Sequence, residues 1–234
     1  MQLFYQPDIL KGIFHLDAEE SRHCVKVLRK QTGDTLQIID GKGTFYTAHI
    51  VKADPRQCTF EIIEKNTEQA KNHHIHLAMA PTKNLDRTEW FVEKTVELGV
   101  DEFSFVICDH SERKVLKPDR LERKAISAMK QSLKATLPTL HPAIPFPKFL
   151  EKLPSTDEKY IAYIDNQKPS PHLNTLLHPH KSYCVLIGPE GDFSPEEVAL
   201  AEKNGFQTVS LGHSRLRTET AGMAACLMLN LCNA

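Results

Sequence analysis

SYCVLIGPEGDFSPEE, residues 182–197, joins a run of apolar residues to a helix start through a loop that contains two glycines. Residues 182–187 are apolar or β-prone and a Gly-Pro pair stops them, which predicts a short buried strand. The loop lacks the lysine of a phosphate-binding P-loop and the glycine spacing of a dinucleotide-binding turn. Gly188, Glu190 and Gly191 therefore predict close approach of the backbone to a ligand other than a nucleoside triphosphate.

The residues that follow this loop are typical of a helix N-terminus. Ser194 can act as N-cap, Pro195 suits the first helical turn, and Glu197 stands three residues after the serine, as in a capping box. We therefore predict structural roles for Ser194, Glu196 and Glu197.

Composition and charge restrict the class of protein. The chain has 234 residues, of which 41% are hydrophobic and 25% charged, which is ordinary for one large or two modest globular domains. No apolar run reaches the roughly 18–20 residues of a membrane span, and the N-terminus lacks a signal-peptide pattern, so we expect a soluble cytoplasmic protein without a membrane partner. A formal charge of −1 means that a nucleic-acid partner would have to bind a local basic patch.

Cysteine and histidine patterns predict no metal site. The six cysteines form no CxxC pair, so we expect buried reduced thiols rather than disulfides or zinc ligands. The histidines at 73–76 and 178–180 have no cysteine or carboxylate partners at recognised spacing.

The first part of the chain, residues 1–70, is predicted to be a small β domain. Residues 35–40, 44–51 and 58–63 read as three strands of a meander with Gly- or Pro-containing turns between them, which indicates a small barrel or sheet. The polar segment 64–72 has no periodicity and marks the predicted domain boundary.

A helix is expected before this meander, over residues 17–29, with Asp17 as N-cap. Four residues are expected on its buried face: Ala18, Cys24, Val25 and Leu28. Three basic residues recur at helical spacing on its other face: Arg22, Lys26 and Arg29. A solvated face is the ordinary interpretation of such a row, and phosphate contact is the alternative.

The second part, residues 73–234, alternates predicted strands and helices. Strands are expected at 75–80, 102–107, 159–164, 182–187 and 208–211, and helices at 85–98, 118–134 and 221–231. This alternation predicts an α/β domain with a mostly parallel sheet, in which ligands bind at the carboxyl ends of the strands. Two loops at such ends, 188–193 and 212–221, are the candidate binding loops.

Two charged clusters stand out in this second part. In LRTETA, residues 216–221, capping of the last helix accounts for Thr218 or Thr220 and for Glu219, but it leaves Arg217 unexplained. Residues 109–134 contain eight Lys/Arg against four Asp/Glu, which favours a phosphate-binding role.

Five motifs in order along the chain carry a resemblance to a known family. They are HCVKVLRKQTGD (23–34), EKTVELGV (93–100), AMKQS (128–132), IGPEGDFSPEE (187–197) and LGHSRLRTETA (211–221). Together they resemble the ribosomal RNA small subunit methyltransferase E (RsmE) family of SPOUT-class enzymes over nearly the whole chain. The resemblance implies methylation of N3 of a uridine in small-subunit (16S) ribosomal RNA with S-adenosyl-L-methionine.

The same resemblance implies the architecture and the partners. It implies an N-terminal PUA-like or OB-like β-barrel that binds RNA and a C-terminal SPOUT α/β domain with a deep trefoil knot. Family members pair through the knotted domain, so the resemblance implies a homodimer, and the nearly all-apolar helix 221–231 agrees with burial on more than one side. The implied partner is the small ribosomal subunit.

Site residues also follow from the resemblance. The implied cofactor-binding residues are Leu186, Ile187, Gly188, Pro189, Glu190, Gly191, Ser210, Leu211, Gly212, Leu216, Arg217, Thr218, Thr220 and Ala221. The implied RNA-binding residues are Arg22, Lys26, Arg29, Arg113, Lys114, Arg120 and Arg123. For catalysis we expect Arg217 to stabilise the uracil anion and Glu219 to hold Arg217, with Glu219 as the general base as the alternative.

The sequence departs from the family pattern in three places. Asp192 stands where a glycine is usual, His213-Ser214 replaces a different pair, and Leu133-Lys134 stands where a glycine and an arginine are usual. Two other functions stay open: a methyltransferase of the same fold with another RNA target, including ribose oxygens of transfer RNA, and a ribosome-assembly factor without catalysis. Arg217, Thr218 and Glu219 beside glycine-containing loops favour an active enzyme.

Overall fold

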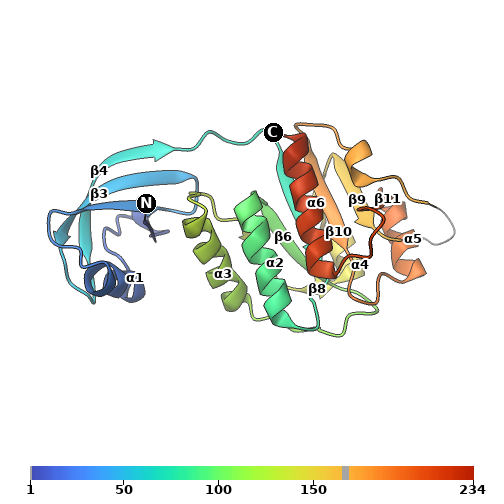
Figure 1. The fold of residues 1–234 in the computed structure, drawn as a ribbon, viewed down its shortest axis with the longest axis horizontal. Coiled ribbons are helices and arrows are strands. Elements are labelled where there is room, and N and C mark those ends of the chain that lie inside the picture. The colour runs from blue at the N-terminus through green and yellow to red at the C-terminus, as the bar shows by residue number, and fades with distance from the viewer. Residues whose placement is uncertain (1, 165–168) are drawn as a thin grey trace. The chain divides into compact units, whose positions relative to one another are not determined.

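The chain forms two compact units (Figure 1). The computed structural model describes residues 2–164 and 169–234. The first unit contains the chain up to residue 70 together with residues 126–137, and the second contains residues 71–125 and 138–234. The segment 126–137, which the sequence places inside the second domain, thus belongs to the first unit.

The first unit is built on a sheet with the strand order β1-β2-β3-β4. The strands are β1 (Leu3–Tyr5), β2 (Thr35–Ile39), β3 (Thr44–Lys52) and β4 (Thr59–Thr67). β1 pairs with β2 in parallel, whereas the predicted meander β2–β4 is antiparallel. β4 continues to Thr67, into the segment whose lack of periodicity suggested a linker. Its first residues also pair with residues 14–16, since Phe60 donates its N–H to the Phe14 carbonyl at 3.0 Å.

The expected helix over 17–29 is shorter and irregular. Asp17 caps α1 (Ala18–Arg22) by accepting the backbone N–H of Glu20 at 2.8 Å, and a π-helical turn over 23–27 follows. Cys24 is fully buried and Val25 half-buried, but Ala18 and Leu28 are exposed, so their predicted burial was wrong. The π turn explains the error at Leu28, because the wider i→i+5 bond rotates the residues after it off the α-helical face.

Residues 126–137 complete the first unit through backbone contacts. Gly43 donates its N–H to the carbonyl of Ala135 at 3.0 Å, and Leu137 donates its N–H to the carbonyl of Gly41 at 2.9 Å. Lys130 forms an ion pair with Glu20. The turn between β2 and β3 is therefore held by a segment that lies some ninety residues further along the chain.

The second unit contains a parallel sheet, as predicted. Its main strand order is β11-β9-β10-β5-β6-β7, and β8 also pairs with β6. The strands are β5 (His74–Met79), β6 (Glu102–Ile107), β7 (Thr139–Leu140), β8 (Ile144–Pro145), β9 (Glu158–Ala162), β10 (Ser182–Ile187) and β11 (Gln207–Val209). All of the described pairings in this sheet are parallel, and β10 lies between β9 and β5.

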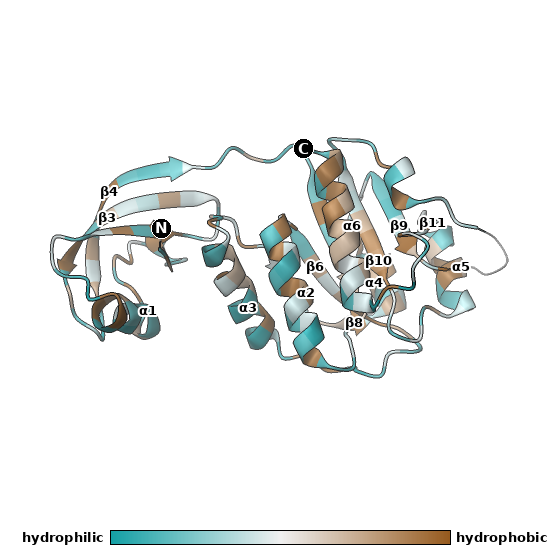
Figure 2. Ribbon diagram, in the orientation of Figure 1, coloured by the Kyte–Doolittle hydropathy of each residue, from teal (hydrophilic) through white to brown (hydrophobic). Residues whose placement is uncertain are grey.

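Helices cover both faces of this sheet, and its central strand β10 is accordingly buried at every position after Ser182. The helices of this unit are α2 (Leu85–Leu98), α4 (Phe146–Lys152), α5 (Pro195–Lys203) and α6 (Thr218–Cys232), whereas α3 (Pro118–Gln131) passes into the first unit at residue 126. On one face, Cys184 and Leu186 of β10 share a core cluster with residues of α4 and α5. On the other face α6 packs on α2, β5 and β10, and Figure 2 shows hydrophobic colour along much of α6.

α2 and α6 approach each other closely. A Cβ added at Gly222 of α6 would lie 2.4 Å from a ring carbon of Phe91 of α2, so only glycine fits at this crossing. In the described part of the chain, no helix is long and apolar enough to cross a membrane.

Candidate active site

A cavity of about 340 Å³ opens where three neighbouring strands of the second unit end. Its wall includes Ala162, Ile187 and Val209, which are the last residues of β9, β10 and β11. The carboxyl ends of parallel strands meet at one edge of a sheet, so loops that are far apart in sequence come together there. The volume lies within the range of small-molecule sites.

Most of the residues predicted to bind a cofactor line this cavity. They are Ile187, Gly188, Pro189, Glu190, Ser210, Leu211, Gly212, Leu216, Arg217, Thr218 and Ala221. Leu186, Gly191 and Thr220 are not among the lining residues, and Leu186 is fully buried in the core. Residues that the sequence reasoning missed also line it: Arg87, Ala162, Tyr163, Ile164, Asp192, Val209, Ser214 and Arg215.

The loop after β10 is anchored by its own side chains. Ser194 and Glu197 form the predicted capping box, in which Glu197 accepts the N–H of Ser194 at 2.9 Å. Ser194 also donates its hydroxyl to the Asp109 carboxylate at 2.8 Å, and Asp109 donates its N–H to Glu197 at 3.0 Å. Glu190 accepts the N–H of Lys83 at 3.0 Å. The loops after β5, β6 and β10 are therefore tied together before any ligand binds.

The glycines of this loop lie close to side chains of the protein itself. A Cβ at Gly188 would lie 3.0 Å from the ring of Phe193, and a Cβ at Gly191 would lie 3.0 Å from the Cβ of His110. These glycines therefore make room for the protein's own side chains. Gly188 also lines the cavity, and close approach of its backbone to a ligand stays a prediction. Gly212 has open space around its Cβ position, and its φ of +128° is what requires glycine there.

Asp192 takes a left-handed backbone conformation, with φ of 64°. This accounts for the glycine that is usual at the position, and aspartate is one of the residues that tolerate the conformation best. Its carboxylate accepts the N–H of Phe193 at 2.8 Å, and burial raises its pKa above the usual range. Asp192 therefore adds a half-buried carboxyl group to the cavity wall.

The N-terminus of α6 lies at the cavity without a side-chain cap. Arg217 is the N-cap residue and makes no capping hydrogen bond with its side chain, so the expectation that Thr218 or Thr220 caps the helix was wrong. The first backbone N–H groups of a helix have no partner within the helix. They offer donors and a positive dipole end beside Thr218 and Ala221, which both line the cavity.

Glu219 contacts Arg87 rather than the expected Arg217. Glu219 Oε1 lies 3.7 Å from Arg87 Nε, and Glu219 Oε2 is buried with no hydrogen-bond partner. The sequence reasoning missed Arg87 because α2 lies some 130 residues before Glu219 in the chain. The available signal was its place in the first turn of the helix after β5, which brings it to the carboxyl edge of the sheet.

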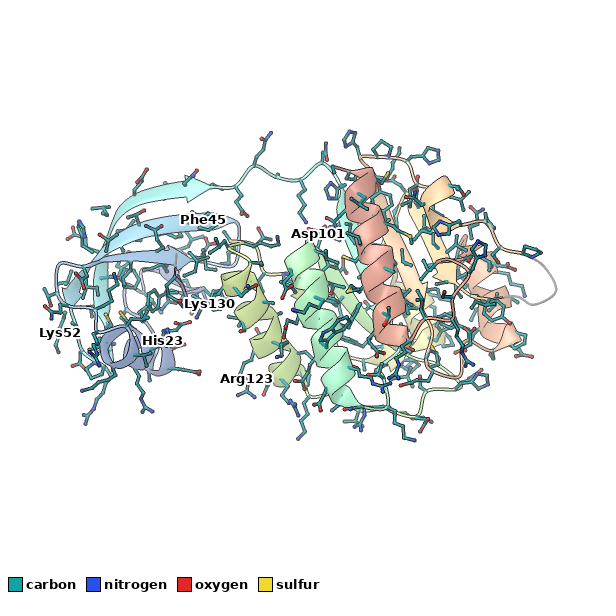
Figure 3. The ribbon with its side chains drawn as sticks, viewed as in Figure 1. His23, Phe45, Lys52, Asp101, Arg123 and Lys130 are labelled. Carbon is teal, nitrogen blue, oxygen red and sulfur yellow. The ribbon has the colours of Figure 1, made fainter. Side chains whose placement is uncertain are left out.

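The predicted RNA-binding residues fall into two groups in separate units. Arg22, Lys26 and Arg29 are exposed in the first unit. In the second unit, Arg120 is paired with Glu89 at 2.6 Å and with Asp86 at 3.5 Å. Arg113 donates to the Lys83 carbonyl at 2.9 Å, Arg123 extends from α3 (Figure 3), and Lys114 is exposed. Arg113 and Arg120 therefore also stabilise the fold. Arg123 donates to the Asp119 carbonyl of its own helix at 3.2 Å, which leaves Lys114 more available for phosphate contact.

Metal-binding groups do not gather in the described part of the chain. Within it, no group of three or more His, Cys, Asp or Glu side chains has an arrangement that could hold a metal ion.

Comparison with known proteins agrees with this geometry. Residues 68–230 match the profile of the RNA methyltransferase domain family, and residues 16–63 match that of the RNA methyltransferase PUA domain. Ribosomal RNA small subunit methyltransferase E from Buchnera aphidicola is 29% identical, over 97% of this chain and 92% of its own length.

Two solved structures are similar over 100% of this chain and 98% of their own. A probable rRNA-methyltransferase from Porphyromonas gingivalis is 44% identical, with a TM-score of 0.94. Ribosomal RNA small subunit methyltransferase E from Neisseria gonorrhoeae, bound to S-adenosyl methionine, is 30% identical with a TM-score of 0.88. The chain therefore belongs to the ribosomal RNA small subunit methyltransferase E family of RNA methyltransferases.

Proposed function

We propose that the protein transfers the methyl group of S-adenosyl-L-methionine to N3 of a uridine in small-subunit ribosomal RNA. The observation that carries the proposal is the cavity at the ends of β9, β10 and β11, beside the uncapped N-terminus of α6. The Neisseria gonorrhoeae relative bound to S-adenosyl methionine, which aligns over the whole chain, supports the choice of cofactor.

The residues of the cavity suit this cofactor. Ile187, Leu211 and Leu216 supply apolar surface for an adenine ring, and the backbone of residues 188–190 and 210–212 supplies polar groups. The free N–H groups at the start of α6 suit an acceptor such as a carboxylate. When bound, the cofactor would supply a sulfonium methyl group.

Arg217 is our candidate for stabilising the substrate. N3 of uridine carries a weakly acidic proton, which would pass to solvent water. The N3 anion would then form a bond to the methyl carbon as the methyl–sulfur bond of the cofactor breaks. The negative charge of this anion spreads to the two carbonyl oxygens of the ring, and a fixed guanidinium at the cavity wall lowers the energy of that anion. We expect Arg217→Ala to lower kcat by about 10²-fold, with affinity for S-adenosyl-L-methionine nearly retained.

Methylation assays test the proposal directly. Small ribosomal subunits that lack their base methylations are incubated with the protein and labelled S-adenosyl-L-methionine, and mass spectrometry of the digested RNA locates the product. We expect N3-methyluridine from the natural protein and little from Arg217→Ala, with calorimetry measuring cofactor binding in both. Methyl groups on ribose would support the alternative target class, and RNA binding without methylation would support an assembly factor.

We further propose a homodimer formed through α6 and α2. Leu227 and Leu231 on α6 are 41% and 64% exposed, and Trp90 on α2 is 38% exposed, so an apolar surface remains on this pair of packed helices. A second copy of the chain is the occupant that fits, because the resemblance to the family implies pairing through this domain. Light scattering should give twice the chain mass at micromolar concentration.

A charged residue on this surface should separate the copies, because association would bury its charge without a partner. Leu227→Asp/Leu231→Asp should therefore lower the measured mass to that of one chain. Val115→Asp is the matched control, since Val115 is 73% exposed and lies outside α2 and α6. A monomeric natural protein would overturn this part of the proposal.

The first unit is proposed to bind RNA through Arg22, Lys26 and Arg29. Contacts of exposed basic side chains with phosphates release counterions, so each contact adds to the salt dependence of binding. Arg22→Ala/Lys26→Ala should weaken RNA binding and lower the slope of log K against log salt by about 1 to 2, with cofactor affinity unchanged. Lys11→Ala/Arg56→Ala removes the same charge from the same unit as a control, and equal slopes in both double variants would contradict the assignment.

We also propose that the C-terminal domain contains a deep trefoil knot. We propose the cytoplasm as the compartment in which the protein binds ribosomal RNA. β11 lies at one edge of the sheet beside β9, whereas α6, which follows it, packs on α2, β5 and β10. The chain thus crosses back over the sheet next to the cavity loops, as threading requires. A knot predicts that the denatured chain, pulled from both ends, extends less than its residue count allows.

A further inference from the structure

Arg87 stands apart from the other residues of the cavity wall. Among the lining residues described, it is the one that α2 contributes, whereas the others end β9, β10 or β11, follow them, or begin α6. α2 follows β5, and it is separate in sequence from the loops to which we assign cofactor binding. Arg87 therefore brings a positive charge to the cavity from a separate element.

A buried carboxylate holds this arginine. Glu219 is 7% exposed, and its Oε1 lies 3.7 Å from Arg87 Nε. The side chain of Arg87 is 39% exposed, so the pair has a buried acid and a guanidinium that reaches the cavity. A buried carboxylate is costly without a compensating cation, and Arg87 is the cation that the structure pairs with it.

The pair is incomplete as it stands. Glu219 Oε2 is buried with no hydrogen-bond partner, although an arginine can offer two parallel N–H donors to one carboxylate. Orphaned buried oxygens are rare in folded proteins. The loose geometry leaves N–H donors of Arg87 without a carboxylate partner at the cavity, where an incoming acceptor can use them.

This inference rests on the methyl transfer to N3 of uridine proposed above. The uracil anion carries its charge on two carbonyl oxygens, one on each side of N3. We propose that Arg87 contacts one of these oxygens and that Arg217, from the loop after β11, contacts the other. Glu219 is then a positioning residue, which acts through Arg87 rather than on the proton of N3.

Planar guanidinium donors suit carbonyl oxygens that become anionic, and preorganised donors are worth more in a site that excludes water. Arg215 is less suited to this role because its charge attracts Asp192 of the loop after β10. Arg87 and Arg217 approach from different elements, so together they can hold the ring in one orientation and aim N3 at the methyl group.

Arg87→Gln tests the proposal through its pH dependence. Since Arg87 favours loss of the N3 proton, the variant should lower kcat by about 10²-fold and move the rise of the rate–pH profile to higher pH. The affinity for S-adenosyl-L-methionine should stay within about 2-fold, measured by calorimetry, and Arg87→Lys should restore part of kcat because it keeps the charge. Lys159→Gln, which removes one charge at the start of β9, should change none of these values.

Two results would overturn the role of Arg87. If it only stabilises the fold, Arg87→Gln lowers the melting temperature and cofactor affinity, and the pH profile does not shift. If it only grips a phosphate, KM for RNA rises and kcat is unchanged.

A double-variant cycle tests the role of Glu219. Because Glu219 acts through Arg87, adding Glu219→Gln to Arg87→Gln should cost much less than Glu219→Gln costs alone. Equal and additive losses would show that Glu219 acts on the reaction independently and would overturn its positioning role. A failure of the proposed function is distinguishable, because the unsubstituted protein would then bind no cofactor or methylate no uridine.

Discussion

Leu133 holds a backbone conformation that leucine disfavours. Its φ is 56°, and it directly follows Ser132 at the end of α3. Its N–H bonds to the Lys130 carbonyl at 3.3 Å, and the next N–H, of Lys134, bonds to the Met129 carbonyl at 3.0 Å. This is the Schellman pattern of a helix end, in which the left-handed residue is usually glycine. The glycine expected at this position from the family resemblance thus has a conformational reason.

Leu133→Gly should therefore stabilise the protein. The left-handed conformation costs a residue with a Cβ roughly 1–2 kcal/mol, and Leu133 is 45% exposed, so little packing is lost. We expect the free energy of unfolding to rise by about 1 kcal/mol in denaturant titrations. Glu122→Gly, at an exposed position inside the helix, should lower it by a similar amount. A loss at Leu133 equal to that at Glu122 would contradict the explanation.

At the scale of elements, the contact between α2 and α6 sets how close the two helices lie. Gly222→Ala would place its Cβ 2.4 Å from the ring of Phe91, which is fully buried and cannot move outward. We expect a loss of about 1–3 kcal/mol in unfolding free energy from overpacking. Phe91→Leu should recover part of this loss in the double variant, since it removes ring atoms from the crossing. Additive losses in the two variants would mean that the helices do not meet as described.

Strong local signals explain which elements could be predicted. The bounds of α2, Leu85–Leu98, were predicted from helical periodicity and from Gly99, whose φ of 103° ends the helix. Helical periodicity gave the wrong buried face at the π turn after α1, because the pattern of apolar residues does not show that this turn contains one extra residue. The two-residue strands β7 and β8 are too short to show any period.

In the candidate active site, too, residues in contiguous motifs could be predicted and residues brought in by long-range packing could not. Most cavity residues in the two glycine-containing loops were predicted because they lie in contiguous motifs, although Asp192, Ser214 and Arg215 of the same loops were missed. Arg87 and residues 162–164 were missed, since only the packing of distant strands and helices brings them to the cavity. Gly188 lines the cavity, and its missing Cβ also leaves room for the Phe193 ring, 3.0 Å from the Cβ position; its contact with a cofactor stays a prediction.

For the whole molecule, a cluster at the start of β5 and β6 makes stability depend on pH. Glu102 accepts from His74 at 2.9 Å and from His141 at 2.7 Å. The hydrogen bond with His74 is the main cause that lowers the pKa of Glu102 to about 2, and it raises the pKa of His74. Burial lowers the pKa of nearby His76 to about 4, so that side chain stays neutral in the folded protein under mild acid.

The sign of each contribution follows from its shift. The stability that Glu102 contributes is fully present above its usual pKa of 4.5 and is lost as the pH falls toward 2. The stability that His74 contributes is present below its usual pKa of 6.5 and is lost as the pH rises through the raised pKa of the folded state. Glu102→Gln should thus cost most between about pH 4.5 and 6.5, roughly 1–3 kcal/mol in unfolding free energy. Glu61→Gln, at an exposed position, should cost little at any pH. A cost that does not vary with pH would contradict the ion-pair explanation.

The membership of residues 126–137 in the first unit has a consequence for how such proteins can evolve. A gene fusion that joined residues 1–70 to another enzyme would transfer the sheet but not residues 126–137. This segment accepts the hydrogen bond from the Gly43 N–H and donates one to the Gly41 carbonyl. Recombination at a single linker therefore cannot transfer the complete RNA-methyltransferase PUA unit. We expect it to be inherited together with its catalytic domain, so that its binding preferences change by point substitution rather than by exchange of whole modules.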